Sequence, residues 1–195
     1  MTRRFVIHAP LFSRRGFLTG TGAVVVAGLT GACDTLSIPP PPEVGPLPPI
    51  TPQEDFYLQS CCGTPDLDPD TFVMEIVDGA TGAVLGSIDR DFVESIADAR
   101  QKEHTLQCIG ANPRFLFVDN AVWTGLPFTD VLALLGVTVP EAAVELVFFG
   151  ADGYDTSIPI EDLETPIWLV WGMNDEPLTL PHGAPFRFLV PGRYG

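Results

Sequence analysis

The sequence predicts an α+β domain that is rich in strands and covers residues 53–195. Three observations carry this prediction. Short β-branched and aromatic runs recur between Gly- and Pro-rich turns, two segments have the spacing of short amphipathic helices, and no internal repeat is present. With 46% apolar and 18% charged residues the composition is that of a globular chain. About 150 residues make one domain that needs no disulfide framework.

Charge is unevenly distributed along the chain. All 25 acidic residues follow Cys33, whereas four of the ten basic residues precede it. From residue 34 onward six basic residues stand against 25 acidic ones, for a net charge of −19. A surface this acidic repels phosphate backbones, which argues against a nucleic acid as the partner.

Residues 1–33 have the features of an export leader. Ser13-Arg14-Arg15-Gly16-Phe17-Leu18 places an arginine pair before Phe-Leu, and an uncharged run from Gly16 to Ala32 follows. That run is too short and too rich in Gly and Thr for a membrane span. The pattern resembles a twin-arginine signal, whose transporter moves folded proteins, and it predicts a periplasmic protein. An ordinary secretory signal with a chance arginine pair is the alternative.

The end of this leader has two interpretations. Leu29-Thr30-Gly31-Ala32-Cys33 resembles a bacterial lipoprotein cleavage site, which would make Cys33 a lipidated N-terminus and anchor the protein to the membrane. The usual large aliphatic residue lies one position further from the cysteine than that pattern expects. Cleavage by an ordinary signal peptidase near Ala32 is the other interpretation.

Residues 34–52 form a linker in which eight prolines lie between positions 38 and 52. Because proline fixes φ and lacks an N–H donor, this segment is expected to join neither a helix nor a sheet. An extended polyproline stalk of about 3.1 Å per residue is one interpretation, and a plain disordered linker is the other.

The first elements of the domain are a hairpin and a helix. Thr71–Val77 and Ala83–Ile88 are β-branched runs on either side of Asp78-Gly79, which predicts two antiparallel strands. A cap at Asp89 or Asp91 then predicts a helix that continues to Arg100, with its apolar residues on one face.

The second half of the domain alternates strands with one more helix. His104–Cys108 is expected to be a strand, and Pro127–Leu135 a short helix with proline in its first turn and Gly136 at its end. Three further strands are expected, at Val144–Phe149, Ile167–Trp171 and Phe186–Val190. Asp152-Gly153-Tyr154 is expected to be a turn, and Trp123 to pack in the core.

Cys108, His182 and Arg187 are the residues with the most chemical potential. Cys108 ends an apolar strand, where a cysteine can present its sulfur to a cleft, and a buried free cysteine is the alternative. His182 and Arg187 could bind an anionic ligand together, and a solvated loop is the alternative for both.

Nine short segments occur in a characteristic order: Ile50–Tyr57, Thr64–Asp68, Leu106–Asn112, Trp123–Phe128, Asp152–Tyr154, Ser157–Pro159, Met173–Leu178, His182–Arg187 and Val190–Gly195. This order resembles the molybdopterin-binding domain of the sulfite oxidase family, in which Trp123-Thr124-Gly125 would be a turn before a helix. The resemblance implies the mixed, β-rich α+β fold of that family over residues 53–195.

The resemblance also implies a mononuclear molybdenum enzyme that binds molybdopterin. Cys108 would be the one protein thiolate on the metal, and Asp152, His182 and Arg187 would contact the pterin or its phosphate. The reaction would be oxygen-atom transfer or related two-electron chemistry on a small-molecule substrate, with a membrane haem subunit or a soluble cytochrome as the electron partner. Twin-arginine export agrees, since this cofactor is inserted before translocation.

The chain departs from the family at two places. Gln59-Ser60-Cys61 stands where members often carry Arg-Asn-His, and the absence of that arginine argues against sulfite as the substrate. Members also continue past the final Pro-Gly-x-x-Gly turn with a Lys- and Trp-containing segment, whereas this sequence stops at Gly195. That difference predicts a fragment, or a truncated protein that holds the cofactor weakly.

Two other functions are compatible with the residues. One is a cofactor-less, stalk-mounted binding module that retains the fold. The other is a structural lipoprotein stabilised by zinc or by a disulfide. Cys61 and Cys62 could form a vicinal disulfide or remain two unreactive thiols, and a zinc site that joins them to His104 and Cys108 lacks any paired metal-ligand spacing.

Overall fold

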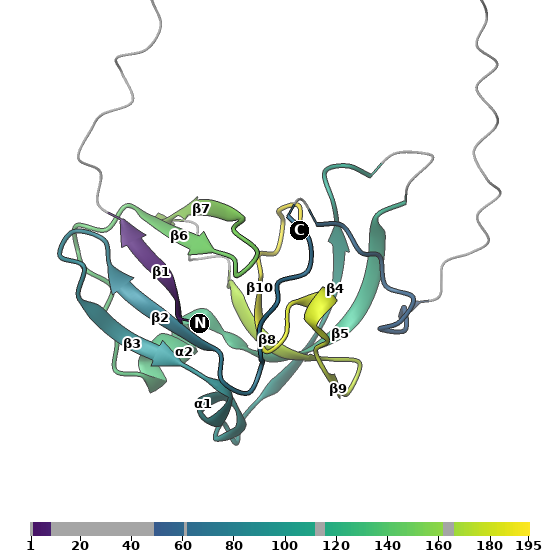
Figure 1. Ribbon diagram of the computed structural model, residues 1–195, viewed down its shortest axis with the longest axis horizontal. Coiled ribbons are helices and arrows are strands. Elements are labelled where there is room, and N and C mark those ends of the chain that lie inside the picture. The colour runs from purple at the N-terminus through teal and green to yellow at the C-terminus, as the bar shows by residue number, and fades with distance from the viewer. Residues whose placement is uncertain (1, 9–48, 61, 112–115, 162–165) are drawn as a thin grey trace, which may run out of the picture.

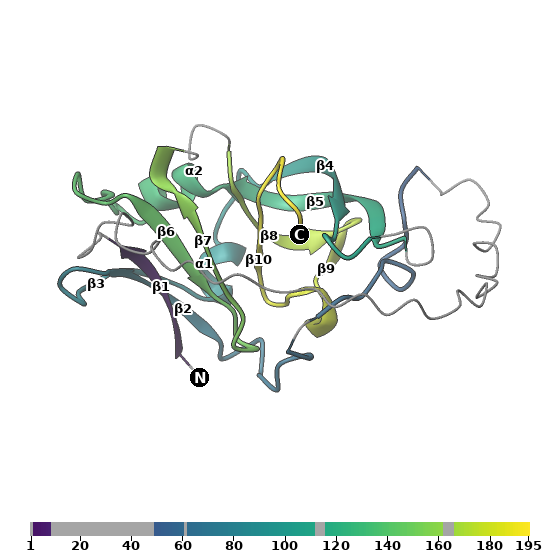
Figure 2. The ribbon, with the colours of Figure 1, turned by 90° about the horizontal axis from the view of Figure 1, so that it is seen from above.

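Two sheets dominate the computed structural model, which describes residues 2–8, 49–60, 62–111, 116–161 and 166–195. Sheet A has the strand order β3-β2-β1-β6-β7 and sheet B the order β10-β8-β5-β4, with β9 paired to β8. Figure 1 shows sheet A on the left and sheet B on the right, and Figure 2 shows the same pair from above. The prediction of a β-rich α+β domain is confirmed.

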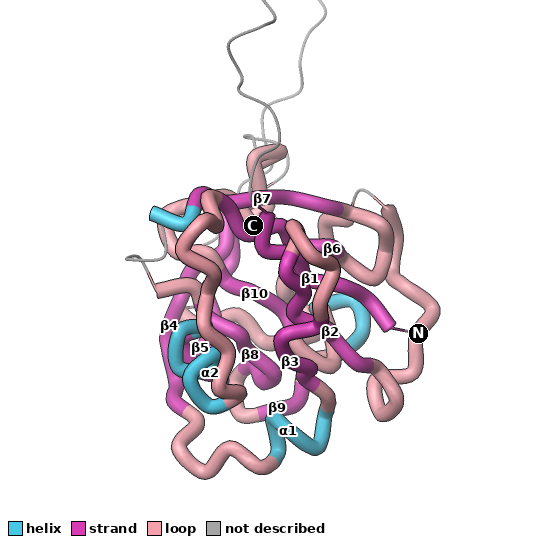
Figure 3. Tube along the Cα trace, turned by 90° about the vertical axis from the view of Figure 1, so that its left-hand side faces the viewer, coloured by secondary structure: helices cyan, strands magenta, loops and turns pink. Residues whose placement is uncertain are grey.

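The elements have the following bounds. Sheet A comprises β1 (Thr2–His8), β2 (Val73–Asp78), β3 (Val84–Ile88), β6 (Glu145–Phe149) and β7 (Asp155–Pro159). Sheet B comprises β4 (Arg100–Gln107), β5 (Val118–Pro127), β8 (Trp168–Met173), β9 (Glu176–Pro177) and β10 (Arg187–Leu189). The helices are α1 (Arg90–Glu94), α2 (Phe128–Leu134) and the 3-10 turn η2 (Leu180–His182). Figure 3 labels the two α-helices, which are both short.

The predicted β2–β3 hairpin and the helix α2 are confirmed. β2 and β3 pair antiparallel, and the Asp78 carboxylate accepts the backbone N–H of Ala80 at 2.8 Å to close the turn. α2 begins after Pro127 and ends before Gly136, which adopts φ 68°. Glycine tolerates this left-handed conformation at a helix end, as the sequence indicated.

The predicted helix to Arg100 is wrong in its length. The Asp89 side chain caps the start of the helix by accepting the backbone N–H of Phe92. However, α1 ends at Glu94, where the Ser95 hydroxyl donates to Phe92 O at 2.6 Å. Arg100 instead begins β4, where it lies opposite Gly125 of β5. The long pairing of β4 with β5 therefore takes priority over the local helical pattern.

The interpretation of Trp123-Thr124-Gly125 as a turn is also wrong. These residues lie inside β5, a ten-residue strand that the sequence did not predict, at a register shift between Thr124 and Gly125. A Cβ atom on Gly125 would lie 2.1 Å from the carbonyl oxygen of Leu169. Glycine is needed here because the backbones of β5 and β8 approach too closely for a side chain.

Three further strands were not predicted. β7 and β9 are short strands that complete hairpins with β6 and β8. β1 was not expected because it lies within the predicted leader. It pairs with both β2 and β6 in the middle of sheet A. Removal of residues 1–33 on export stays a prediction. The segment that would be removed includes β1.

Two apolar clusters form the core. The first packs sheet A against the two α-helices and against residues of β5 and β8, with Ile76, Ile88, Phe128 and Leu146 fully buried. The second lies on sheet B, where Trp123 is fully buried, as predicted. Among the described residues no helix is both long and apolar enough to cross a membrane.

Candidate functional site

Residues 49–57, which we call the strap, cross sheet B and hold the candidate site together. The Thr51 N–H donates to Asn120 O at 2.8 Å, and Asn174 Nδ2 donates to Thr51 O at 2.8 Å. The Asp119 carboxylate accepts both the Thr51 hydroxyl at 3.0 Å and the Tyr57 backbone N–H at 2.7 Å. Since buried polar groups require such partners, these bonds determine where Tyr57 lies.

Gln53 fastens the centre of the strap to the segment that follows β8. Its side-chain amide donates to Pro177 O at 3.2 Å and accepts the Thr179 N–H at 3.1 Å. The Gln53 carbonyl accepts a hydrogen bond from His182 Nε2 at 2.9 Å. Because a carbonyl oxygen can only accept, Nε2 carries a proton. The other ring nitrogen, Nδ1, does not take part in this hydrogen bond.

His182 is a buried residue with a perturbed pKa. It is 6% exposed, and its ring packs edge-on against Phe56 with 5.8 Å between ring centroids. Burial lowers the pKa of His182, the hydrogen bond to Gln53 opposes this shift, and the charge of Arg187 adds to it. The solvated-loop alternative is therefore wrong for His182.

Arg187 lies beside His182 because Gly183 turns the chain between them. Gly183 has φ 96°, and a Cβ atom there would lie 2.9 Å from Arg187 Cβ. Arg187 Nη1 donates to His182 O at 3.3 Å, and its guanidinium lies 5.5 Å from the centroid of the Trp123 ring. Burial lowers the pKa of Arg187, and the solvated-loop alternative is wrong here as well.

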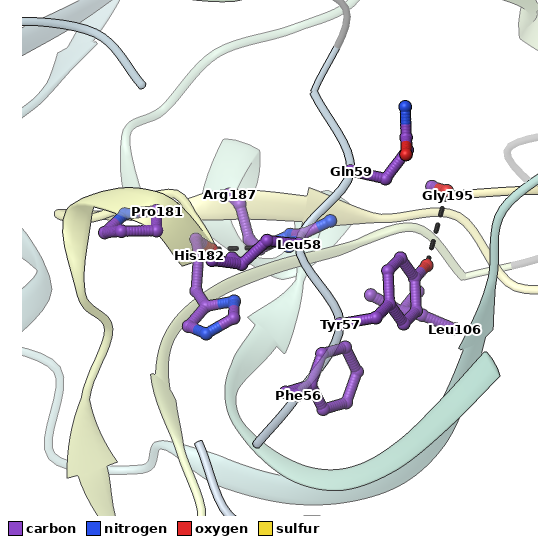
Figure 4. A pocket seen from close by; sticks show the side chains of 9 residues that line it. All are labelled: Phe56, Tyr57, Leu58, Gln59, Leu106, Pro181, His182, Arg187 and Gly195. Carbon is purple, nitrogen blue, oxygen red and sulfur yellow. Dashed lines mark hydrogen bonds between the residues drawn. The ribbon is translucent and has the colours of Figure 1, made fainter. Parts of the chain in front are cut away.

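Tyr57 connects the separate parts of the site. Burial raises the pKa of Tyr57 to about 12, the charge of Arg187 opposes that shift, and Cys108 and Asp119 reinforce it. The pKa of this one phenol therefore depends on both candidate side chains, Cys108 and Arg187. The Tyr57 hydroxyl donates a long hydrogen bond of 3.5 Å to Gly195 O, drawn as a dashed line in Figure 4.

A small cavity of about 50 Å³ lies between these residues. Figure 4 shows its lining, formed by Phe56, Tyr57, Leu58, Gln59, Leu106, Pro181, His182, Arg187 and Gly195. The strap supplies one wall, the η2–β10 segment supplies another, and β4 supplies Leu106. Segments from both ends of the domain therefore meet at this cavity.

Cys108 follows the last residue of β4, as predicted. Its thiol is free and partly buried, and its backbone N–H donates to Phe117 O at 2.9 Å. The Gly110 N–H donates to Cys108 Sγ at 3.4 Å, which orients the sulfur at the strand end. Asn112, part of the same sequence motif, lies outside the described residues.

Asp152 does not line this cavity. Its carboxylate accepts the Tyr154 N–H at 3.0 Å, and Gly153 adopts φ 96°, so the predicted turn between β6 and β7 is confirmed. Tyr154 is 52% exposed and does not pack in the core. A contact between Asp152 and a cofactor stays a prediction.

The structure describes one residue of the cysteine pair Cys61-Cys62. Cys62 is disulfide-bonded, which excludes a free thiol at this position, and Cys61 lies outside the described residues. Within the described ranges, no three His, Cys, Asp or Glu side chains come together as a metal-binding group.

Sequence reasoning missed Tyr57 and Asp119 as members of the site. The available signal was the aromatic pair Phe56-Tyr57 directly after the Pro-rich linker. Asp119 gave no local signal, because its role depends on a residue 62 positions away.

Comparisons with known proteins show the family to which the chain belongs. The sequence profile of the family described as "Oxidoreductase molybdopterin binding domain" matches residues 62–195. Human mitochondrial sulfite oxidase is 32% identical over 179 residues, a match that covers 80% of this chain and 32% of that protein. An inducible NADH nitrate reductase of Glycine max is 29% identical over 181 residues, covering 77% of this chain and 20% of that enzyme. The chain thus spans about a third or less of these relatives.

The fold is shared with a solved structure. The crystal structure of the sulfane dehydrogenase SoxCD from Paracoccus pantotrophus superposes with a TM-score of 0.61 at 23% identity, covering 75% of this chain and 40% of that one. At this identity the likeness establishes the fold alone. It confirms the β-rich architecture that the sequence predicted.

Proposed function

The chain belongs to the oxidoreductase molybdopterin-binding domain family, and from this premise we propose that it is an exported oxidoreductase domain whose molybdenum cofactor is bound through Cys108. The observation that carries the proposal is the convergence of a free thiol, a partly buried guanidinium and a buried imidazole around Tyr57. When bound, such a cofactor supplies oxygen-atom transfer or related two-electron chemistry.

Cys108 is the natural metal ligand of this group. Soft thiolates suit metals of this kind, and Cys108 is free, partly buried and placed at a strand end. The Gly110 N–H holds its sulfur in one orientation. A ligand fixed in this way needs little rearrangement on metal binding.

Arg187 would bind the phosphate of the cofactor. Among the residues that the structure describes, no carboxylate forms an ion pair with it, and one of its guanidinium nitrogens is used by the His182 carbonyl. A partly buried cation without a counter-ion is costly unless an anion binds it. The guanidinium fork matches a phosphate, and the neighbouring neutral His182 ring adds a polar group without a second charge.

The space available limits how the cofactor would enter. The cavity holds about 50 Å³, whereas ligand sites are usually roughly 300–1,000 Å³. Leu58 is 59% exposed and Gln59 is also exposed, so this part of the wall has few contacts to lose. We expect Leu58–Gln59 to move outward on binding, while the hydrogen-bonded strap up to Tyr57 stays in place.

The role of Tyr57 would be to donate a proton in a hydrogen bond. With a pKa of about 12 its phenol stays protonated through the physiological range. Asp119 holds the Tyr57 backbone, and the ring packs on Phe56 with centroids 5.3 Å apart. Tyr57 would therefore be a fixed donor next to the bound group.

The substrate would be a small molecule other than sulfite. Gln59 lines the cavity where family members often carry an arginine, and a neutral amide attracts an oxyanion less than a guanidinium does. The acidic domain favours a basic electron partner, such as a haem subunit or a soluble cytochrome. Export by the twin-arginine route to the periplasm, with or without lipidation of Cys33, completes the proposal.

Cofactor retention tests the role of Arg187. The full chain is produced in a host that makes molybdopterin, and the pterin released by acid denaturation is measured for the wild type, Arg187→Lys and the matched surface variant Arg100→Lys. We expect Arg187→Lys to retain at least about tenfold less pterin, since one bidentate charged contact is lost. Equal retention in all three proteins would refute the proposed role of Arg187.

The small cavity also favours a second candidate, a cofactor-less binding module with the same fold. This module would fold stably in a host that cannot make molybdopterin and would carry no pterin from a host that can. A folded, pterin-free wild-type protein from the competent host would support the module and contradict the enzyme.

A further inference from the structure

The N-terminal strand β1 holds the two halves of sheet A together. It pairs in parallel with β2, from Thr2 opposite Val73 to Ile7 opposite Asp78. On its other side it pairs antiparallel with β6, from Val6 opposite Val147 to His8 opposite Glu145. In Figure 1 the purple strand β1 lies between the β2–β3 and β6–β7 hairpins.

Without β1 these two hairpins would each present an open edge. β2 and β6 carry the fully buried residues Ile76 and Leu146. These two strands therefore cannot move away from the core to cover their open edges. Unpaired N–H and C=O groups on such an edge are a template for another strand. The position of β1 is therefore a binding site for an extended peptide, filled here by residues 2–8.

The same residues belong to the predicted export leader. A strand that completes a sheet and a leader that is removed are compatible if the strand is held by an exchangeable contact. Strand addition of this kind obtains its affinity from main-chain hydrogen bonds. Residues 2–8 are separated from β2 by more than 60 positions of sequence, so the pairing does not depend on a tight turn.

Charge indicates which peptides would fit. The register places Arg4 opposite Glu75 and His8 opposite Glu145. The chain from residue 34 onward has six basic residues against 25 acidic ones. A domain this acidic attracts a basic peptide, and residues 5–7, Phe-Val-Ile, have high strand propensity.

We propose that the groove between β2 and β6 is a strand-accepting site, whose occupant is the chain's own segment 2–8, held as an exchangeable strand. Its ligand class is an extended peptide with basic residues around a β-branched and aromatic centre. This proposal does not rest on the cofactor, because peptide exchange is measured without reference to pterin or metal.

Exchange is tested on the full chain with a protease recognition sequence inserted between residues 33 and 48. The folded protein is cleaved and passed through gel filtration, and a fluorescent peptide of residues 1–10 is then added while anisotropy is followed. We expect the cleaved N-terminal fragment to elute with the domain and the labelled peptide to replace it.

The control peptide carries Val6→Pro. Val6 is paired on both sides, to Val77 and to Val147, and proline has no N–H to donate to either strand. We expect this peptide to bind at least about tenfold more weakly, at low salt and at high salt alike. Equal binding of the two peptides would show mere attraction of a basic peptide to an acidic protein and would overturn the proposal.

A second measurement covers the case in which cleavage itself disrupts the domain. Hydrogen exchange is compared between the intact wild type and intact Val6→Pro. We expect residues 73–78 and 145–149 to lose protection in the variant, whereas β4 and β5 keep theirs. Unchanged protection of β2 and β6, or failure of the labelled peptide to bind an intact cleaved domain, would overturn the proposal.

Discussion

The carboxylate of Asp119 accepts the backbone N–H of Tyr57 at 2.7 Å, across 62 residues of sequence. Its other oxygen accepts the Thr51 hydroxyl, so one side chain of β5 holds both ends of the strap. Asp119 thus anchors Tyr57, which the strap brings to the cavity. The site is thus supported by a partly buried polar network as well as by sheet B itself.

Asp119→Asn should destabilise the domain by about 1–3 kcal/mol, because a partly buried, charge-assisted hydrogen bond to the strap is weakened. Chemical denaturation measures the change in the free energy of unfolding. The matched control is Asp130→Asn, which removes an exposed ion pair with Arg100 and should cost about 1 kcal/mol or less. Equal effects of the two changes would contradict the role given to Asp119.

Gly125→Ala should destabilise the protein by at least about 1–3 kcal/mol, because the new Cβ atom would lie 2.1 Å from Leu169 O. β5 and β8 would have to separate at the bulge. Gly110→Ala is the control, since its Cβ atom would find its nearest neighbour at an ordinary 3.7 Å. Thermal unfolding of the two variants should differ clearly, and similar midpoints would argue against a close approach of β5 and β8.

Stability should fall as the pH rises from about 10 to 12. Burial raises the pKa of Tyr57 to about 12, whereas a tyrosine in the unfolded chain titrates near 10. In this range the folded state keeps a proton that the unfolded state loses, so the free energy of unfolding decreases with pH.

Denaturant unfolding at pH 9 and pH 11 measures this loss. Tyr57→Phe should make the loss smaller, and Tyr154→Phe, at an exposed position, should leave it as in the wild type. A wild-type phenol at position 57 that ionises near pH 10 would contradict the burial of Tyr57.

His182 should titrate below the ordinary value of 6.5, because burial disfavours its charged form. Its contribution to stability is present above pH 6.5 and is lost as the pH falls toward its lower folded pKa. Nuclear magnetic resonance of the imidazole protons gives the midpoint directly. A midpoint at or above 6.5 would mean that the ring is solvated, contrary to its 6% exposure.

Gln59→Arg should increase sulfite oxidation by the cofactor-loaded protein at least about tenfold in kcat/KM, because a guanidinium replaces an amide in the cavity wall. Steady-state kinetics of wild type and variant provide the comparison. Gln101→Arg, at the far end of β4 from Cys108, adds the same charge away from the cavity and should have little effect. Efficient sulfite oxidation by the wild type would contradict the proposed exclusion of sulfite.

Local sequence patterns predicted the elements whose stability is local. The Asp78 turn defines the β2–β3 hairpin, and Gly136 ends α2, because one residue at each place has a specific conformational role. β5 was missed because Gly125, which usually weakens a strand, is required here by the backbone of another strand. The helix at Asp89 was predicted too long because nothing local reveals that Arg100 pairs with Gly125.

The same distinction applies to the site. Cys108, His182 and Arg187 stand out by residue type, and the structure brings His182 and Arg187 to one cavity, with Cys108 interacting with Tyr57 beside it. Asp152 has a local role in its turn, and the sequence could not separate this role from a cofactor contact. Asp119 and β1 act only through residues distant in the sequence, so no local pattern could reveal them.

Molybdenum per chain is the most direct measurement of the central claim. The full chain is purified from a host with intact cofactor synthesis, and elemental analysis is performed on the wild type and on Cys108→Ala, with circular dichroism to confirm that both are folded. Binding through Cys108 predicts close to one molybdenum per wild-type chain and a large loss in the variant. A folded wild-type protein without molybdenum, or equal molybdenum in both proteins, would contradict it.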